Sequence, residues 1–237
     1  MSASERICIA LDFPTRAEVL AAAKRFAGRV GWLKVGLEAF VAEGPSLVAE
    51  VVSVSGGAKV FLDLKFHDIP ATVAGAVASA GRSGAAMVNV HASGGRAMLA
   101  AARDAAARAG LEKLIAVTLL TSLDARGLAD LPMAGHPEGI ARRLARLAQE
   151  CGLDGVVCSA SDLPAIRGAC GPGFFTVVPG IRPAGSDLQD QKRVATPAAA
   201  LAAGADLLVI GRPVTAAPDP EAALDRILAE ASRPVGA

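Results

Sequence analysis

The sequence is poor in aromatic residues and carries almost no net charge. Only 3% of its 237 residues are aromatic, tyrosine is absent, and 24 Lys and Arg nearly balance 23 Asp and Glu, for a formal net charge of +1. Proteins that bind nucleic acids usually show a basic excess together with stacking side chains. The composition therefore argues against a nucleic-acid partner.

Cysteine pairs, long apolar runs and a leader-like N-terminus are also missing from the sequence. Cys8, Cys151, Cys158 and Cys170 form no Cys-x-x-Cys pair or other metal-like spacing, which predicts reduced, mostly buried thiols. No apolar run approaches the roughly 18 residues of a membrane-spanning helix. The opening MSASERICIALD lacks the basic and long apolar regions of a secretory signal. We therefore expect no metal, no membrane association and a cytoplasmic location.

Short β-rich runs alternate with Ala-, Leu- and Arg-rich helical stretches along the whole chain. The runs predicted as strands are Ile7–Asp12, Trp32–Val35, Lys59–Lys65, Met87–His91, Leu114–Thr118, Gly155–Cys158, Phe174–Val178 and Leu207–Ile210. Predicted helices between them include Ala17–Phe26, Arg96–Ala109, Ile140–Glu150 and Ala198–Ala203. Thr15 with Glu18 is typical of a capping box, and Thr196 and Asp219 precede prolines as helix caps.

Eight β/α units without a linker-like segment favour a single (β/α)₈ TIM barrel over residues 1–237. Strands that are apolar throughout are expected where both faces of a sheet are covered. A doubly wound open sheet is the alternative, but its usual Gly-x-Gly-x-x-Gly after the first strand is absent. Two long connections, 119–137 and 179–194, follow strands five and seven, on the face where barrels place active sites. Their length is typical of lids or binding loops.

Polar side chains stand at or just after the ends of most predicted strands. They are Asp12, Lys34, Asp63, Lys65, His91, Thr118, Thr121, Ser122, Ser159, Arg182 and Arg212. Asp63 and Lys65 are two apart on a strand, so both side chains should point into the barrel. Buried charges are unfavourable unless they are paired, and clusters of them are enriched at active sites. A purely structural ion pair in the barrel mouth is the alternative interpretation.

The segments PGIRP and IGRP follow strands seven and eight and each combine a glycine with an arginine. Barrels commonly bind a phosphate at this position, through backbone N–H groups and a nearby cation. Arg212 has the bidentate geometry that phosphate oxygens accept. Two ordinary surface arginines beside turn glycines are the alternative, but the repetition on consecutive strands favours a phosphate site.

The run from Asp63 to Thr72, DLKFHDIPAT, closely resembles the DxKxHDIPxT signature of bacterial orotidine 5′-phosphate decarboxylases. The similarity extends over nearly the whole chain, through ALD at Asp12, LKVG at Lys34, VTLLTS, PGIRP, DQKR and IGRP, in that order. Residues 124–136 match nothing diagnostic. The resemblance implies a cofactor-free enzyme that converts orotidine 5′-phosphate to UMP and CO₂ in pyrimidine biosynthesis, by electrostatic stabilisation of a ring carbanion.

The same resemblance implies a role for each matching residue. Lys65 would donate the proton, while Asp63 would lie against the substrate carboxylate. Asp12 and Lys34 would hold the ribose hydroxyls. In a homodimer, Asp68 and Thr72 would enter the partner subunit's site, and Asp68 would complete a Lys-Asp-Lys-Asp chain. The remaining implied contacts are Thr121 and Ser122 at the pyrimidine edge, and Gln191, Arg182, Gly211 and Arg212 at the phosphate.

Four other functions stay open on the residues alone. A magnesium-dependent keto-sugar phosphate decarboxylase would also use Asp63 and Lys65, but HDIPAT and DQKR argue against it. A Schiff-base aldolase needs a neutral lysine, whereas acids here favour the charged form. A metal hydrolase using His67, Asp68 and His91 would lack helical ligand spacing. A non-catalytic phosphate-binding protein would not need the paired acid and lysine.

Overall fold

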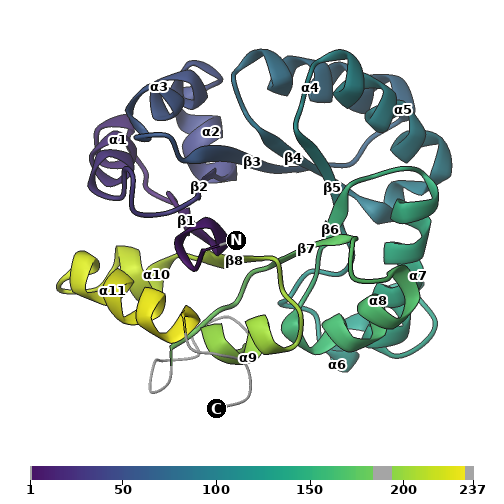
Figure 1. The fold of residues 1–237 in the computed structure, drawn as a ribbon. Coiled ribbons are helices and arrows are strands. Elements are labelled where there is room, and N and C mark those ends of the chain that lie inside the picture. The colour runs from purple at the N-terminus through teal and green to yellow at the C-terminus, as the bar shows by residue number, and fades with distance from the viewer. Residues whose placement is uncertain (1, 184–193, 233–237) are drawn as a thin grey trace.

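The strands form a closed barrel, as the computed structural model shows for residues 2–183 and 194–232 (Figure 1). All strand pairs are parallel and follow the chain order, with β8 closing on β1. The strands are β1 Ile7–Ala10, β2 Trp32–Val35, β3 Lys59–Phe66, β4 Met87–His91, β5 Lys113–Val117, β6 Gly155–Val157, β7 Phe175–Val178 and β8 Leu207–Ile210. Each predicted strand is found, with its ends shifted by two residues or fewer, which confirms the (β/α)₈ barrel.

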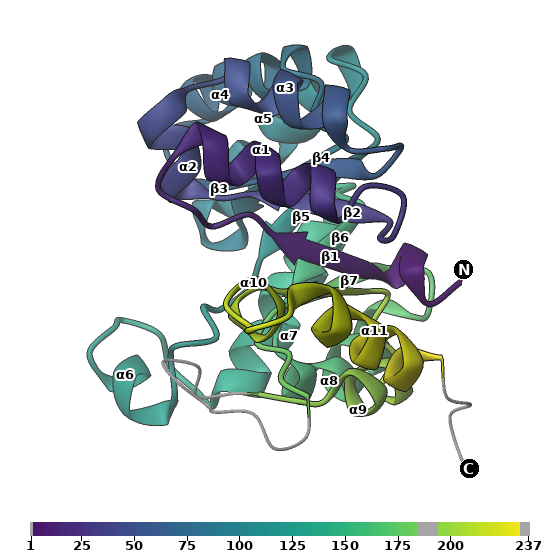
Figure 2. The same ribbon diagram turned by 90° about the vertical axis from the view of Figure 1, so that its left-hand side faces the viewer.

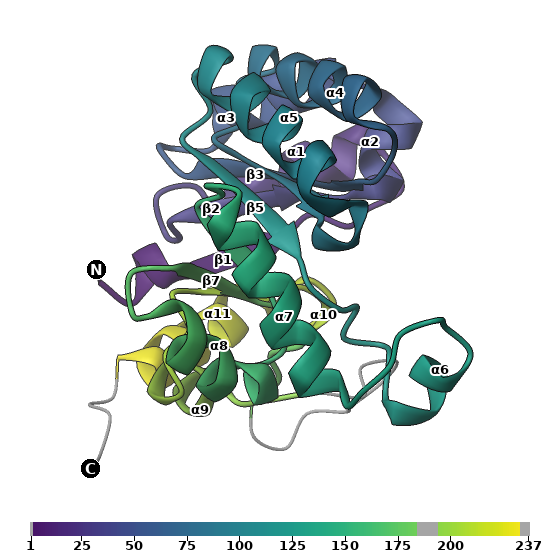
Figure 3. The same cartoon turned by 90° about the vertical axis from the view of Figure 1, so that its right-hand side faces the viewer.

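Helices surround the barrel on its outer side (Figures 1 and 3). They are α1 Arg16–Arg25, α2 Leu37–Glu43, α3 Ser46–Val54, α4 Pro70–Arg82, α5 Gly95–Arg108, α6 Ala125–Ala129, α7 Pro137–Glu150, α8 Leu163–Cys170, α9 Pro197–Ala202, α10 Arg212–Thr215 and α11 Pro220–Ala231. Short 3₁₀ turns lie at Ser4–Arg6, Ala92–Gly94 and Ala160–Asp162. Among the described residues, no helix is both long and apolar enough to cross a membrane.

The predicted caps are present, with one difference. The side chains of Thr196 and Asp219 accept hydrogen bonds from the backbone of α9 and α11, and Thr15 accepts one from the Glu18 N–H. The Glu18 carboxylate, however, accepts from the Thr15 hydroxyl at 2.6 Å. The Thr15–Glu18 pair therefore caps α1 through the threonine oxygen alone and is not a reciprocal capping box.

Two apolar cores lie on the two sides of the strands. Side chains that point inward, such as Phe61 and Met87, fill the barrel itself, whereas their neighbours Leu62 and Val88 pack between strands and helices. This division follows from the alternation of side chains along a strand. The four cysteines are free thiols, three of them buried, and burial raises the pKa of Cys8.

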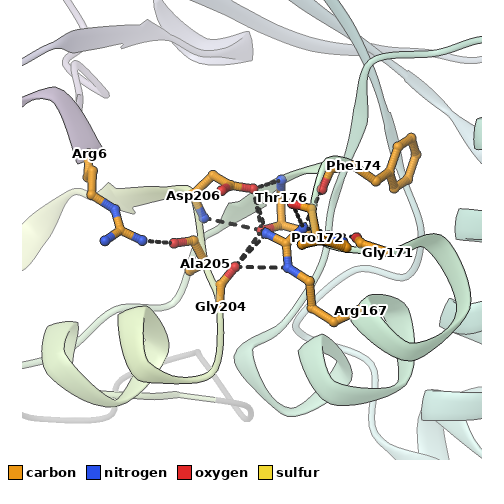
Figure 4. Close-up of polar contacts among 9 residues, drawn as sticks. All are labelled: Arg6, Arg167, Gly171, Pro172, Phe174, Thr176, Gly204, Ala205 and Asp206. Carbon is orange, nitrogen blue, oxygen red and sulfur yellow. Dashed lines mark hydrogen bonds and ion pairs between the residues drawn. The ribbon is translucent and has the colours of Figure 1, made fainter. Parts of the chain in front are cut away.

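A polar cluster joins α8 to the N-terminal ends of β7 and β8 (Figure 4). Its centre is Arg167, which donates to the Asp206 carboxylate and to the Phe174 carbonyl, each at 2.6 Å, and to the Gly204 carbonyl. The Thr176 hydroxyl, 2.8 Å from the same guanidinium, completes the cluster. This end of a barrel usually serves stability and not catalysis.

The connection between β5 and α7 holds the short helix α6, which projects from the barrel (Figures 2 and 3). Asp124 caps α6 by accepting from the Gly127 N–H at 2.9 Å. Leu119, Leu128 and Ile140 form a small separate apolar cluster at its base. The segment therefore has a core of its own, which the alternation of strands and helices did not predict. Of the second long connection, residues 184–193 lie outside the described residues.

Candidate active site

A cavity of about 580 Å³ opens among the C-terminal ends of the strands. The predicted site residues that line it are Asp12, Lys34, Asp63, Lys65, Thr121, Ser122, Arg182, Gly211 and Arg212. Apolar side chains from the barrel interior, including Phe61, Val157 and Val177, form its lower wall. A hollow at this end of the barrel with convergent polar groups is the expected position of an active site.

Two lysines and two acids form a continuous charged chain at one side of this cavity. Lys65 Nζ lies 2.6 Å from Asp63 Oδ1, and Lys34 Nζ lies 3.5 Å from Asp63 Oδ2. Lys34 Nζ also lies 2.9 Å from Asp12 Oδ1. The order of contacts is therefore Asp12, Lys34, Asp63, Lys65. The prediction that Asp63 and Lys65 share the barrel-facing side is confirmed.

Burial and pairing act in opposite directions on these charges. Burial alone would lower the pKa of Lys34, but the carboxylates of Asp63 and Asp12 outweigh it and raise that pKa. Burial would likewise raise the pKa of Asp63, but Lys34, Lys65 and a hydrogen bond from Asn89 lower it. Both groups are thus charged near neutral pH, because each has a counter-charge in contact.

Gly36, at the start of α2, permits the contact between Asp12 and Lys34. A Cβ at this position would lie 2.6 Å from Asp12 Oδ1 and 2.8 Å from Lys34 Nζ. Both distances are shorter than van der Waals contact, so any side chain would push the two groups apart. The glycine of the LKVG segment is therefore part of the site's construction, a role that its sequence context did not reveal.

The glycine–arginine segments follow the neighbouring strands β7 and β8 and line the same cavity. Gly180 has a φ of 75°, a value that favours glycine, and Arg182 beside it is buried. The Arg182 N–H donates to the Ala195 carbonyl at 2.9 Å. Gly211 and the exposed Arg212 follow β8 and line the same hollow. Gln191, predicted at the phosphate, lies outside the described residues.

Known proteins share both the architecture and the sequence of this chain. Residues 5–227 match the family model described as orotidine 5′-phosphate decarboxylase / HUMPS family. The chain belongs to this family. An orotidine 5′-phosphate decarboxylase of Anaeromyxobacter sp. (strain K) is 54% identical over 229 residues, covering 97% of this chain and 99% of the relative.

Two further members of the family support this assignment. The orotidine 5′-phosphate decarboxylase of Halorhodospira halophila is also 54% identical, with 95% of each chain covered. The crystal structure of orotidine 5′-phosphate decarboxylase from Lactobacillus acidophilus superposes with a TM-score of 0.82 at 33% identity, covering 96% of this chain and 99% of that one. Orotidine 5′-phosphate decarboxylases are carboxy-lyases, so this member of the family is an enzyme of that class.

Two residues that the family signature singles out do not line the cavity of this chain. Asp68 and Thr72 are exposed, just before and within α4, and the Asp68 carboxylate accepts from the adjacent Ile69 N–H at 2.6 Å. His67 and His91 lie beside each other, with ring centroids 5.3 Å apart. Burial, followed by the charges of His67 and Lys65, lowers the pKa of His91.

Sequence reasoning missed Asn89 and Glu38. Glu38 of α2 lines the cavity rim. Asn89 of β4 is completely buried and contacts Asp63 and the backbone of Lys65. A signal for Asn89 was present, because Val88 and Val90 are the outward-facing residues of that strand. The alternation therefore points Asn89 into the barrel, one strand away from Asp63.

Proposed function

We propose that this chain converts orotidine 5′-phosphate to UMP and CO₂, a step of pyrimidine biosynthesis. The observation that carries the proposal is the 2.6 Å contact between Lys65 Nζ and Asp63 Oδ1, inside the strand-end cavity. Family membership supplies the substrate class, since the curated relatives are named for this decarboxylation. A cytoplasmic location stays a prediction.

The proposed mechanism is electrostatic and needs no cofactor. Loss of CO₂ leaves an electron pair in the plane of the pyrimidine ring, where the π system does not delocalise it. An ammonium group held at that carbon in a preorganised, dry site stabilises the charge. Lys65 then transfers a proton to the ring carbon, which forms UMP, and the neutral amine regains a proton from solvent. Asp63 would face the departing carboxylate, where like-charge repulsion favours its loss.

The remaining cavity residues are proposed to hold the nucleotide. Asp12 and Lys34 would bind the ribose hydroxyls, and Thr121 and Ser122 the pyrimidine edge. The phosphate would lie at the glycine–arginine side, contacted by Arg182, Gln191, Gly211 and Arg212. Because this phosphate is remote from the reacting carbon, its binding energy is available to order the surrounding loops and exclude water.

We propose a homodimer in which Asp68 and Thr72 enter the partner subunit's cavity. Three observations support this arrangement. Both residues are exposed and lie outside the cavity of their own chain. Large apolar side chains are exposed nearby along the chain, with Ile69 67% exposed, next to Asp68. On α2, Leu37 and Val41 are 52% and 79% exposed, and a partner would cover such surfaces.

The first test follows the absorbance loss when purified protein is mixed with orotidine 5′-phosphate. Lys65→Ala should keep the fold and lose at least about 1,000-fold in kcat, because both the acid and the electrostatic stabilisation are removed. Lys59→Ala is the matched control, since Lys59 lies at the opposite end of the same strand. Substantial turnover by Lys65→Ala would refute the proposed role. Loss of activity in EDTA, or borohydride trapping of an adduct, would favour the magnesium or Schiff-base alternatives.

The dimer is tested by mixing two inactive variants, Lys65→Ala and Asp68→Ala. If Asp68 acts across the interface, a mixed dimer contains one intact site, formed by Lys65 of one chain and Asp68 of the other. Random exchange should then restore about a quarter of wild-type activity. A mixture that stays inactive, although an affinity tag on one variant co-purifies the other, would contradict the cross-subunit arrangement.

A further inference from the structure

Asn89 connects the two central charged residues of the site through a single amide group. Its Nδ2 donates to Asp63 Oδ1 at 2.6 Å, and its Oδ1 accepts from the backbone N–H of Lys65 at 2.8 Å. The side chain is completely buried. Buried polar groups require partners, and here both ends of the amide are used. Its orientation is fixed by chemistry, because a carboxylate only accepts and a backbone N–H only donates.

The backbone at Lys65 needs such a partner because β3 departs from regular pairing there. The register with β4 is regular at Leu62↔Val88 and resumes only at Phe66↔Val90, so β3 contains extra residues at this point. Lys65 has a φ of 51° and is the one non-glycine residue in the left-handed region within the described residues. Such a conformation persists where surrounding contacts hold it. The Asn89 oxygen replaces the strand partner that the Lys65 N–H lacks.

Asn89 also fixes the orientation of the Asp63 carboxylate. Oδ1 receives both the Asn89 amide and the Lys65 ammonium, which leaves Oδ2 directed to Lys34, 3.5 Å away. Without the amide donor, the carboxylate could rotate and exchange its partners. The Asn89 side chain thus constrains Lys65 through the lysine backbone N–H, and Asp63 through the carboxylate oxygen Oδ1.

We propose that Asn89 is a positioning residue for the decarboxylation, holding Lys65 and Asp63 in the geometry that delivers the proton to the ring carbon. This inference rests on the proposed function. Asn89 does not line the cavity, so it should act on turnover and leave substrate binding almost unchanged. A displacement of about 1 Å in a reacting group is sufficient for a roughly 100-fold loss of rate.

Asn89→Leu is the direct test, because it keeps the approximate size and removes both hydrogen bonds. We expect kcat to fall about 10- to 100-fold, while KM and inhibition by UMP change less than about twofold. Thr176→Val is the control, since Thr176 is equally buried and hydrogen-bonded but lies at the opposite end of the barrel. It should lower the thermal midpoint without changing kcat. A kcat of Asn89→Leu within twofold of wild type would overturn the inference.

Asn89→Asp gives a readout that a merely structural role would not show. A protonated carboxylic acid at this position can donate to Asp63 and accept from the Lys65 N–H, whereas an ionised one only accepts. The ratio of variant to wild-type kcat should therefore rise as the pH is lowered. The ratio is used because other ionisable side chains surround the site in both proteins, namely Asp63, Lys65, Lys34, His91 and His67.

The pH ratio decides the question even where Asn89→Leu fails to fold. A ratio of kcat values that does not change with pH would overturn the positioning role. A variant of Asn89 whose KM changes while its kcat does not would overturn it as well. These outcomes differ from failure of the proposed function, in which the wild-type protein itself consumes no orotidine 5′-phosphate. That result would remove the function and this inference together.

Discussion

Replacing Asp63 with asparagine keeps the shape of the side chain and removes its charge. The carboxylate lies 2.6 Å from Lys65 Nζ and 3.5 Å from Lys34 Nζ, and the side chains of Asp63 and Lys34 are 12% and 9% exposed. At an effective dielectric constant of about 20, these attractions are roughly 6 and 5 kcal/mol before desolvation is subtracted. Breaking a buried pair typically costs about 3–5 kcal/mol net.

We expect Asp63→Asn to lower the free energy of unfolding by about 3 kcal/mol, the lower end of that range. Asp12 still lies 2.9 Å from Lys34, and solvent reaches part of Lys65. Urea unfolding at several pH values measures the loss. The pKa of Asp63 is lowered from its ordinary value of 3.8. The stability difference should therefore be complete above pH 3.8 and disappear as the pH falls through the folded-state pKa.

Glu112→Gln is the matched control for this measurement. Glu112 also forms a carboxylate–ammonium pair, 2.5 Å from Lys59 Nζ, but both side chains are nearly half exposed. Solvent-exposed pairs contribute only about 0–1 kcal/mol. If Asp63→Asn costs no more than Glu112→Gln, or if its effect does not change with acidic pH, the reasoning from burial and pairing is wrong.

Three further predictions concern other parts of the molecule. Arg212→Ala should lower kcat/KM for the phosphorylated substrate roughly 10- to 150-fold, which corresponds to about 1.5–3 kcal/mol of transition-state binding; an equal effect on the nucleoside without phosphate would contradict the contact. Gly36→Ala should raise KM, because the new Cβ would lie 2.6 Å from Asp12 Oδ1; an unchanged KM would show that the ion pair adapts freely. Arg167→Met should cost about 3 kcal/mol in urea unfolding without changing kcat, and a lower kcat would show that the two barrel ends are coupled.

The fold could be predicted from the sequence because its strands are short apolar runs with capped helices between them. Few other arrangements of eight such strands bury both faces of the resulting sheet. The small helix α6 was not predicted, since five residues give too little periodicity to identify a helix. It is stabilised locally by Asp124 as its cap and, through tertiary packing, by the cluster of Leu128 with Leu119 and Ile140.

The charged site could be predicted from spacing, but its construction could not. Alternation along the strand places Asp63 and Lys65 on one face, and the structure bears this out. The irregularity of β3 at Lys65 could not be predicted, because the local sequence DLKF contains no glycine or proline and is typical of an ordinary strand. Only the partner strand reveals why the conformation is tolerated, since Asn89 supplies the missing acceptor.

The two lysines of the site differ in their freedom to move, and this difference separates their proposed roles. Lys34 is 9% exposed and is held between Asp12 and Asp63, whereas the Lys65 side chain is 29% exposed and contacts Asp63 alone among these acids. Moving Lys34 toward a ligand would break two ion pairs in a buried place. Moving Lys65 would break its ion pair with Asp63 and replace it by contact with the carbanion on the pyrimidine ring. A proton donor has to approach the reacting carbon and retreat, so the geometry suits Lys65 as the acid and Lys34 as the fixed charge that keeps Asp63 ionised.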